Sequence, residues 1–172
     1  MTVFRYFIDF EANQHSKGPF YLKELCIMDV EKPLRNLCIV FTAPKPWCRT
    51  TEEERKTYSY NERRLHHLNW YEGNAPFDAK AVASTIDWYT GNMNALFFAQ
   101  NAQKTTILQE LLPDLNIINY ADLDERCREV TLAKLPHPPD YITCTYRDHG
   151  RHNCAVLKCY RFCMHYYDTF LM

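Results

Sequence analysis

The sequence has little net charge and no long hydrophobic run. Its 20 lysine and arginine residues are balanced by 21 aspartate and glutamate residues, so the formal net charge is -1. A chain without a basic excess has no overall electric field that attracts nucleic acid, although a local basic patch can still bind it. No stretch of 18 apolar residues is present, which excludes a membrane-spanning helix. We therefore expect no membrane partner.

The N-terminal residues also lack the pattern of a secretory signal, because Asp9 and Glu11 interrupt the first apolar run. We expect an intracellular protein, in the cytoplasm or the nucleus. In that setting the eight cysteines are expected to be reduced thiols or metal ligands rather than disulfides. Cys26 and Cys38 lie within apolar segments and are expected to be small buried packing residues.

The remaining composition is that of a folded protein. Hydrophobic residues make up 47% of the chain and aromatic residues 15%, which excludes a disordered protein. A length of 172 residues is enough for one domain with a sizeable core. Without internal repeats or low-complexity tracts, the sequence predicts a single domain over residues 1–172.

The first strong pattern is a strand over residues 4–11, rich in aromatic and β-branched residues. Asp9 and Glu11 occupy alternate positions near its end and therefore point to the same face. Two neighbouring carboxylates can bind a divalent metal ion, whereas the ordinary alternative is a strand end with acids in solvent. Phe10 points to the opposite face and is expected to pack in the core.

Further elements follow in an order that predicts an α/β fold. Three early strands with short connections suggest an antiparallel meander with the first strand near the centre. Later strands alternate with helices, which implies parallel pairing and helices on the faces of the sheet. The expected strands cover 4–11, 20–30, 34–42, 95–99 and 115–118, and the expected helices 52–65, 79–89, 102–112 and 153–167.

Four segments in this order carry a resemblance to a known family: 6–11, a strand that ends in Asp-x-Glu; 67–77, which ends in Ala-Pro-Phe; 98–105, Phe-Ala-Gln-Asn-Ala-Gln-Lys-Thr; and 152–158, His-Asn-Cys-Ala-Val-Leu-Lys. Together they resemble the three motifs and the connecting loop of 3′–5′ exonucleases of the DEDD type. The resemblance implies a ribonuclease H-like mixed sheet flanked by helices. Such enzymes hold two metal ions with four acidic residues.

The departures from this pattern concern the acids themselves. Thr105 and Lys158 stand where the second and third motifs carry aspartate, and Asn153 stands where the third motif carries histidine. A lysine ammonium repels a metal ion, and only Asp9 and Glu11 remain of the four acids. The resemblance therefore implies a catalytically degenerate domain. The alternative is a metal-dependent nuclease that uses Asp9 and Glu11 with magnesium or manganese.

A cluster of soft ligands precedes the last helix. Cys144, His149 and Cys154 are spaced by four intervening residues each, and thiolate and imidazole are the ligands that zinc prefers. His152 is an alternative to His149, and Cys159 is an alternative to Cys154. The ordinary explanation is a set of buried thiols and surface histidines.

This cluster resembles the Maelstrom domain, an exonuclease-like fold with a Glu-Cys-His-Cys zinc site in place of the acids. It is also similar to a group of uncharacterised arthropod and mobile-element proteins, in which a lysine is expected at Lys104. The resemblance implies a glutamate ligand, for which Glu24 on the second strand is the best candidate. Four protein ligands leave no position for water, so such a zinc ion would be structural rather than catalytic.

These observations predict a domain that acts by binding. Its ligand would be single-stranded RNA or DNA, or alternatively a protein partner or a second copy of the chain. Stacking on aromatic rings and contacts from basic side chains are the usual means of binding a single strand. The candidate residues are Arg147, Arg151, Lys158 and Arg161 for phosphate, and Trp70, Tyr71 and Tyr146 for bases. An apolar C-terminal segment, 166–172, is the candidate for a protein interface.

Overall fold

The computed structural model describes residues 2–14, 20–91, 94–144 and 154–172. Its centre is a five-stranded sheet in the order β3-β2-β1-β4-β5. The strands are β1 (Phe4–Gln14), β2 (Phe20–Asp29), β3 (Asn36–Val40), β4 (Ala95–Ala99) and β5 (Ile117–Asn119). β1, β2 and β3 pair antiparallel, whereas β4 pairs parallel with both β1 and β5. The predicted mixed sheet with the first strand at its centre is confirmed.

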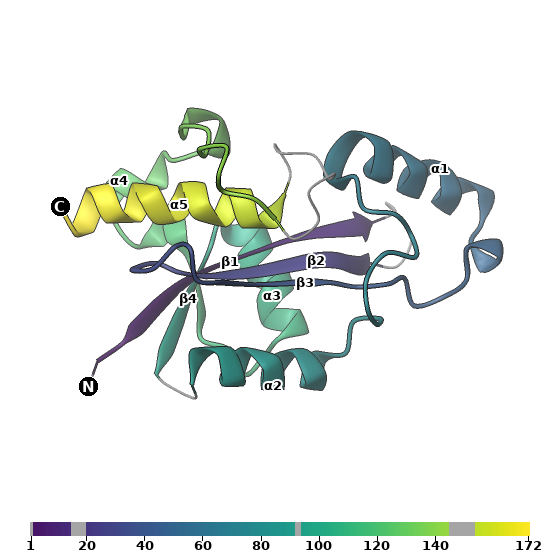
Figure 1. Ribbon diagram of the computed structural model, residues 1–172, viewed down its shortest axis with the longest axis horizontal. Helices are drawn as coiled ribbons and strands as arrows, with labels where there is room; N and C mark the ends of the chain where they lie inside the picture. Colours follow the sequence, from purple (N-terminus) through teal and green to yellow (C-terminus); the bar gives the residue numbers. More distant parts are fainter. Residues whose placement is uncertain (1, 15–19, 92–93, 145–153) are drawn as a thin grey trace.

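Helices cover both faces of the sheet, as Figure 1 shows. α5 (Ala155–Phe170) lies on one face, and α2 (Ala79–Thr90) and α3 (Ala102–Leu111) lie on the other. α1 (Glu52–Asn61) lies beyond one end of the strands, and the short α4 (Glu125–Arg128) is on the same side of the sheet as α5. The predicted arrangement of an α/β sheet flanked by helices is therefore correct.

The helices begin where the sequence provides capping side chains. Thr51 and Glu54 form a capping box at the start of α1, with each side chain accepting a hydrogen bond from the other residue's backbone amide. Asp78 caps α2 and Asn101 caps α3. Each does so with one side-chain oxygen that accepts a hydrogen bond from a backbone amide of the first turn. The first helix is shorter than expected, because the α-helical pattern widens into a π-helical turn over Glu62–His66.

The alternation of β1 separates two hydrophobic cores. Tyr6, Ile8 and Phe10 pack against α2 and α3, as expected for Phe10, whereas Phe7 packs in the core beneath α5. Because side chains alternate along a strand, Asp9 shares the face of Phe7 and is also covered by α5. The polar residues discussed below therefore lie in the layer between the sheet and α5.

A buried lysine holds the segment between α1 and α2 against the sheet. The ammonium group of Lys23 on β2 donates hydrogen bonds of 2.7–3.3 Å to the backbone carbonyls of Phe41, Asn69, Trp70 and Glu72. Its side chain is fully buried, and this burial lowers its pKa to about 8. Within the described part of the chain, no helix is both long and apolar enough to cross a membrane.

Candidate metal centre

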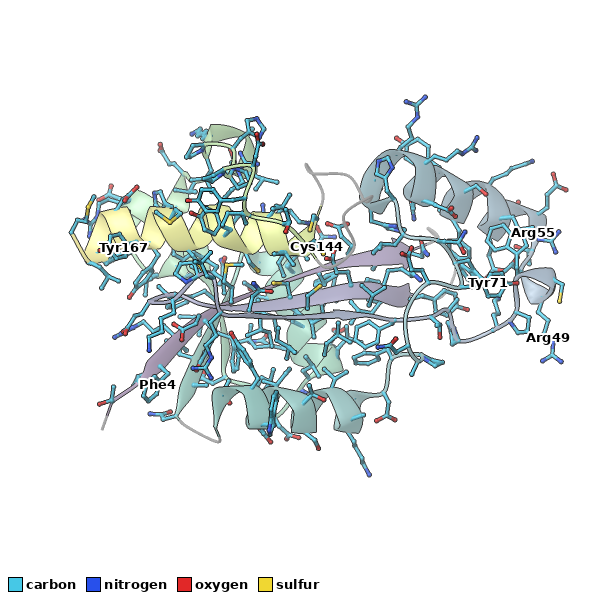
Figure 2. All side chains as sticks on the ribbon, in the orientation of Figure 1. Phe4, Arg49, Arg55, Tyr71, Cys144 and Tyr167 are labelled. Atoms are coloured by element: carbon cyan, nitrogen blue, oxygen red, sulfur yellow. The ribbon has the colours of Figure 1, made fainter. Side chains whose placement is uncertain are left out.

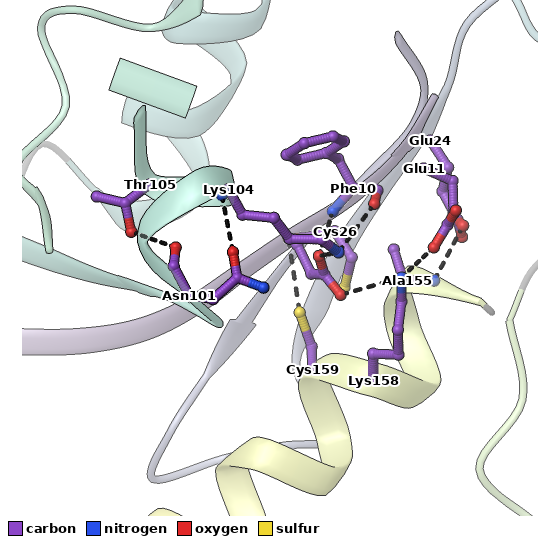
Figure 3. Close-up of polar contacts among 11 residues, drawn as sticks. Phe10, Glu11, Glu24, Cys26, Asn101, Lys104, Thr105, Ala155, Lys158 and Cys159 are labelled. Carbon is purple, nitrogen blue, oxygen red and sulfur yellow. Dashed lines mark hydrogen bonds and ion pairs between the residues drawn. The ribbon is translucent and has the colours of Figure 1, made fainter. Parts of the chain in front are cut away.

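Glu24 lies at the middle of the candidate site. β2 places it directly opposite Glu11 of β1, on the face covered by α5, and none of its surface is exposed. Its Oε2 accepts a hydrogen bond of 3.0 Å from the backbone amide of Ala155, the first residue of α5. The carboxylate thus interacts favourably with the positive end of that helix. Figure 3 shows Glu24 and Glu11 side by side above this turn.

Three thiols converge on the other oxygen of Glu24. The Sγ atoms of Cys38, Cys144 and Cys154 lie 3.5, 3.6 and 3.7 Å from Oε1. Cys38 and Cys144 are themselves 3.9 Å apart, sulfur to sulfur. The donor atoms of Glu24, Cys144 and Cys154 all lie within 4.8 Å of one another, and all three residues are buried. Figure 2 shows Cys144 beside the first turn of α5.

These distances fit a tetrahedral ion with thiolate and carboxylate ligands. With bonds of about 2.3 Å to sulfur and about 2.0 Å to oxygen, the edges of such a tetrahedron are about 3.8 Å between sulfurs and about 3.5 Å between sulfur and oxygen. The observed separations of 3.5–3.9 Å match both values. The soft donors favour zinc over magnesium or manganese.

The thiols are held in their protonated form without a cation. The hydrogen bond to Cys144, burial and the nearby carboxylate of Glu24 all raise the pKa of Cys38. The same three influences raise the pKa of Cys154. A metal ion reverses this preference, because its positive charge stabilises thiolates and releases their protons. Binding of a metal at this site would therefore become stronger as the pH rises.

The structure brings together the predicted ligands that it describes. Glu24, Cys144 and Cys154 form one group, whereas His149 and His152 lie outside the described residues. The alternative ligand Cys159 points elsewhere, because its thiol donates to the carbonyl of Cys26 at 3.8 Å. The structure forms no disulfide among the eight cysteines, all of which lie in the described residues.

Cys38 is the residue that sequence reasoning missed. It packs against the core beneath α5, as expected, but it is only partly buried and its thiol also contacts Glu24 and Cys144. Alternation along β2 predicts that Cys26 and Glu24 share a face, but the pairing that adds Cys38 is a property of the fold. Cys26 is two residues from Glu24 on β2 and pairs with Cys38 on β3, so all three side chains share one face of the sheet.

Next to this thiol site lies a cluster of two acids and two lysines: Asp9, Glu11, Lys104 and Lys158 (Figure 3). The ammonium of Lys158 on α5 bonds Glu11 and lies 3.3 Å from Asp9 Oδ2. The ammonium of Lys104 on α3 bonds the other oxygen of Asp9 and lies 3.3 Å from the carbonyl of Phe10. We refer to these four residues as the acid–lysine cluster.

The charges of the acid–lysine cluster cancel. Burial raises the pKa of Asp9, but the ammonium groups of Lys104 and Lys158 outweigh it and leave the pKa below its ordinary value. Burial lowers the pKa of Lys158, yet Asp9 and Glu11 outweigh it and leave that pKa raised. At Glu11 burial outweighs the two lysines and leaves the pKa raised. Asp9 and Lys158 stay charged near neutral pH. A divalent cation would have to displace an ammonium group to reach Asp9 and Glu11.

Three of the predicted nucleic-acid contacts, Trp70, Lys158 and Arg161, are buried in this structure. Trp70 is only 4% exposed, and its ring stacks on Tyr58 with centroids 4.8 Å apart, so it offers no free face to a base. Lys158 is buried and bonds the carboxylates described above instead of presenting its charge to phosphate.

The guanidinium of Arg161 donates to the carbonyls of Leu132 and Leu135. The other predicted nucleic-acid contacts divide into two groups. Arg147, Arg151 and Tyr146 lie outside the described residues. Tyr71 is 62% exposed and remains accessible for stacking.

Comparison of the chain with protein-family models finds no match, and comparison with curated proteins finds none either. The exonuclease-like and Maelstrom-like interpretations therefore rest on the sequence motifs, and they enter the following section as proposals.

Proposed function

We propose that this protein is a catalytically degenerate, exonuclease-like domain with a structural zinc ion, which acts by binding RNA or a protein partner. The fold class required for this proposal, an α/β mixed sheet with flanking helices, is present. The observation that carries the proposal is the acid–lysine cluster. Its two ammonium groups occupy the positions where a nuclease would need cations beside Asp9 and Glu11.

The alternative is a metal-dependent nuclease that uses Asp9 and Glu11 with magnesium or manganese. Two-metal catalysis requires cations that touch the attacking and leaving oxygens. Here the two carboxylates are neutralised by Lys104 and Lys158, and Thr105 and Lys158 stand at the positions of the two other expected acids. The geometry therefore favours a protein that binds without cleaving.

Incubation with labelled single-stranded RNA and DNA in the presence of magnesium or manganese tests the absence of catalysis. The wild-type protein should leave both substrates intact, as should the double variant Asp9→Asn/Glu11→Gln. Cleavage by the wild type that disappears in the double variant would contradict the proposal and establish the nuclease alternative. Cleavage of equal strength in both proteins would point to a contaminating nuclease, and removal of that contaminant should leave no activity.

Zinc is the metal that the donors fit best, with Glu24, Cys144 and Cys154 as ligands from the described residues. The sequence predicts His149, or His152 in its place, as a further ligand. The ion would join β2 to the start of α5, so that metal binding contributes directly to folding stability. Elemental analysis of protein purified without added metal or an affinity tag should find one zinc ion per chain.

Replacement of Cys144 or Cys154 by serine should remove the zinc ion and lower the melting temperature. Purified wild-type protein without any zinc would contradict the structural-zinc part of the proposal. It would leave the test of catalysis unaffected, because the acid–lysine cluster involves none of the thiols.

RNA is the ligand that the resemblance suggests, and single-stranded DNA is its close chemical relative. An open pocket above the acid–lysine cluster is lined by the polar side chains of Gln14, Asn101, Gln103 and Lys104. Exposed Tyr71 supplies a ring for stacking, and the predicted Arg147 and Arg151 would supply phosphate contacts. Affinity for a single-stranded oligonucleotide that falls steeply with salt would support this ligand.

A protein partner or a homodimer is supported by the end of the chain. Leu171 and Met172 are exposed, at 44% and 87%, directly after the apolar helix α5. Exposed apolar side chains that lie together often mark a protein interface. We also propose a location inside the cell, in the cytoplasm or nucleus, because a chain with eight cysteines and no disulfide fits a reducing compartment. Sedimentation analysis would distinguish a homodimer from a monomer that binds another protein.

A further inference from the structure

Cys38 is placed by the sheet itself. β3 pairs antiparallel with β2, and Cys38 lies directly opposite Cys26. Cys26 is two residues from Glu24 on β2, so the three side chains share one face. The side chain of Cys38 therefore points into the layer beneath α5, toward Glu24. Its position depends on backbone pairing of strands and not on the segment that contains the predicted histidine ligands.

Cys38 lies at ligand distance from two of the other three donors, although among the described residues the group whose donor atoms all lie within 4.8 Å of one another is Glu24, Cys144 and Cys154 alone. The Sγ of Cys38 lies 3.5 Å from Glu24 Oε1 and 3.9 Å from Cys144 Sγ. The tetrahedral edges expected around zinc are about 3.5 and about 3.8 Å for these two kinds of pair. Cys144 and Cys154 meet the same oxygen at 3.6 and 3.7 Å, so the three sulfurs are nearly equidistant from Oε1.

Packing accounts for only part of this position, because Cys38 packs against the core beneath α5 and also places its thiol beside a buried carboxylate. Cys26, the neighbour across the strand pair, is completely buried, whereas Cys38 is only half-buried at the edge of the sheet. A small apolar side chain would fill the same space without directing a polar atom toward a buried carboxylate. Sulfur beside a buried carboxylate and a second sulfur is the arrangement that soft metal ions select.

We propose that Cys38 is the fourth ligand of the metal ion, which is then held by Glu24, Cys38, Cys144 and Cys154. This assignment rests on the zinc ion of the proposed function and adds the identity of its fourth ligand. The described part of the chain then supplies all four donors, and the site needs neither His149 nor His152. Zinc joins three elements: β2 through Glu24, β3 through Cys38, and the start of α5 through Cys154.

The set of three thiolates and one carboxylate also has a consequence for charge. Four negative ligands around a divalent cation leave a net charge of -2 in a buried place. The N-terminus of α5 faces this charge, and the Ala155 amide already donates to Glu24. The partial positive charge of a helix N-terminus stabilises such an anionic group.

X-ray absorption at the zinc edge of the wild-type protein provides the first test, because it counts sulfur and lighter neighbours separately and needs no substitution. We expect three sulfurs at about 2.3 Å and one oxygen. Two sulfurs together with the signature of imidazole would overturn the assignment of Cys38. A protein without zinc would overturn the assignment together with the structural-zinc proposal, so the two failures are distinguishable.

Substitutions then separate the candidates. His149→Ala/His152→Ala should retain one zinc per chain with three sulfur neighbours, whereas Cys38→Ser should show two sulfurs and lose zinc to a chelator at least tenfold more readily. Cys159→Ser is the matched control, because Cys159 is a buried thiol in the same core that contacts the carbonyl of Cys26. This control should behave as wild type. Loss of zinc from the double histidine variant, with Cys38→Ser unchanged, would overturn the assignment.

Discussion

Glu11 and Glu24 lie directly opposite each other on β1 and β2, and their carboxylates have different partners. Glu11 bonds the ammonium of Lys158, whereas Glu24 faces the thiols of Cys38, Cys144 and Cys154. Two adjacent carboxylates on one sheet face repel each other unless each has its own positive partner. Glu11 has a lysine as this partner, whereas Glu24 accepts the Ala155 amide and faces three thiols that could hold a cation.

The first turn of α5 joins these two sites. Ala155 donates its amide to Glu24, and Lys158, three residues later, reaches Glu11 and Asp9. The helix is therefore fixed to the sheet through its N-terminal amide and through a buried ion pair. Its packing against Phe7 and the rest of the core beneath it completes the attachment. A substitution at Glu11 or at Glu24 should therefore also alter the contacts of the other carboxylate through this turn.

Replacement of Lys158 by methionine should lower the free energy of unfolding by about 3 kcal/mol, because it removes the ammonium partner of half-buried Glu11 and one of the two ammonium partners of buried Asp9. Denaturation in urea measures the difference. Lys56→Met is the control, since Lys56 forms an exposed pair with Glu52 on α1 and should cost less than about 0.5 kcal/mol.

A double-mutant cycle separates charge from packing. Adding Glu11→Gln to the Lys158→Met variant should recover part of the lost stability, because the carboxamide needs no counter-charge. Equal costs for Lys158→Met and Lys56→Met would show that the acid–lysine cluster does not stabilise the fold.

The depressed pKa of Asp9 predicts a loss of stability in acid. Because its folded-state pKa lies below the ordinary value of 3.8, Asp9 stabilises the folded state above that pH. This contribution is lost as the pH falls through the folded-state pKa, since the unfolded chain binds the proton more readily. The stability difference between wild type and Asp9→Asn, measured at several pH values, should therefore shrink below about pH 4.

Acid also affects the thiol site, but it does so equally in the wild type and in Asp9→Asn. This effect therefore cancels in the stability difference between the two proteins. A stability difference between wild type and Asp9→Asn that stays constant down to pH 3 would contradict the pairing of Asp9 with the two lysines.

Sequence reasoning predicted the sheet because local patterns specify it. The alternation of β1, the run of apolar residues in β4 and the capping residues Thr51, Asp78 and Asn101 each gave a signal within a few residues. The short helix α4 gave none, since four residues cannot show a helical period. The end of α1 was also missed, because a π-helical turn follows from packing around buried His66 and not from propensity.

The candidate site was predictable in its chemistry and less so in its contacts. Glu24, Cys144 and Cys154 follow from residue type and from a resemblance, whereas Cys38 depends on the register of two strands, which sequence periodicity does not fix. The sequence makes Trp70 a candidate for base stacking, with packing in the interior as the alternative. Its burial against Tyr58 and Trp47 results from long-range packing that composition cannot reveal.

Replacement of Lys23 by methionine should destabilise the protein by about 3 kcal/mol or more, because it leaves two buried and two partly buried backbone carbonyls without a charged donor. Hydrogen exchange should show increased opening around Asn69–Glu72, and denaturation in urea gives the free energy. Lys80→Met, at an exposed position of α2, should leave both measurements unchanged. Unchanged exchange in the Lys23 variant would show that the carbonyl contacts do not hold this loop.

Two substitutions at Glu24 distinguish metal binding from helix capping. Glu24→Gln keeps an oxygen that accepts from the Ala155 amide but lacks the charge of a good zinc ligand, whereas Glu24→Ala removes both functions. We expect both variants to lose zinc, and Glu24→Ala to be less stable than Glu24→Gln by at least about 1 kcal/mol. A chelator should lower the melting temperature of the wild type and leave both variants unaffected. A chelator effect that persists in the variants would place the zinc ion away from Glu24.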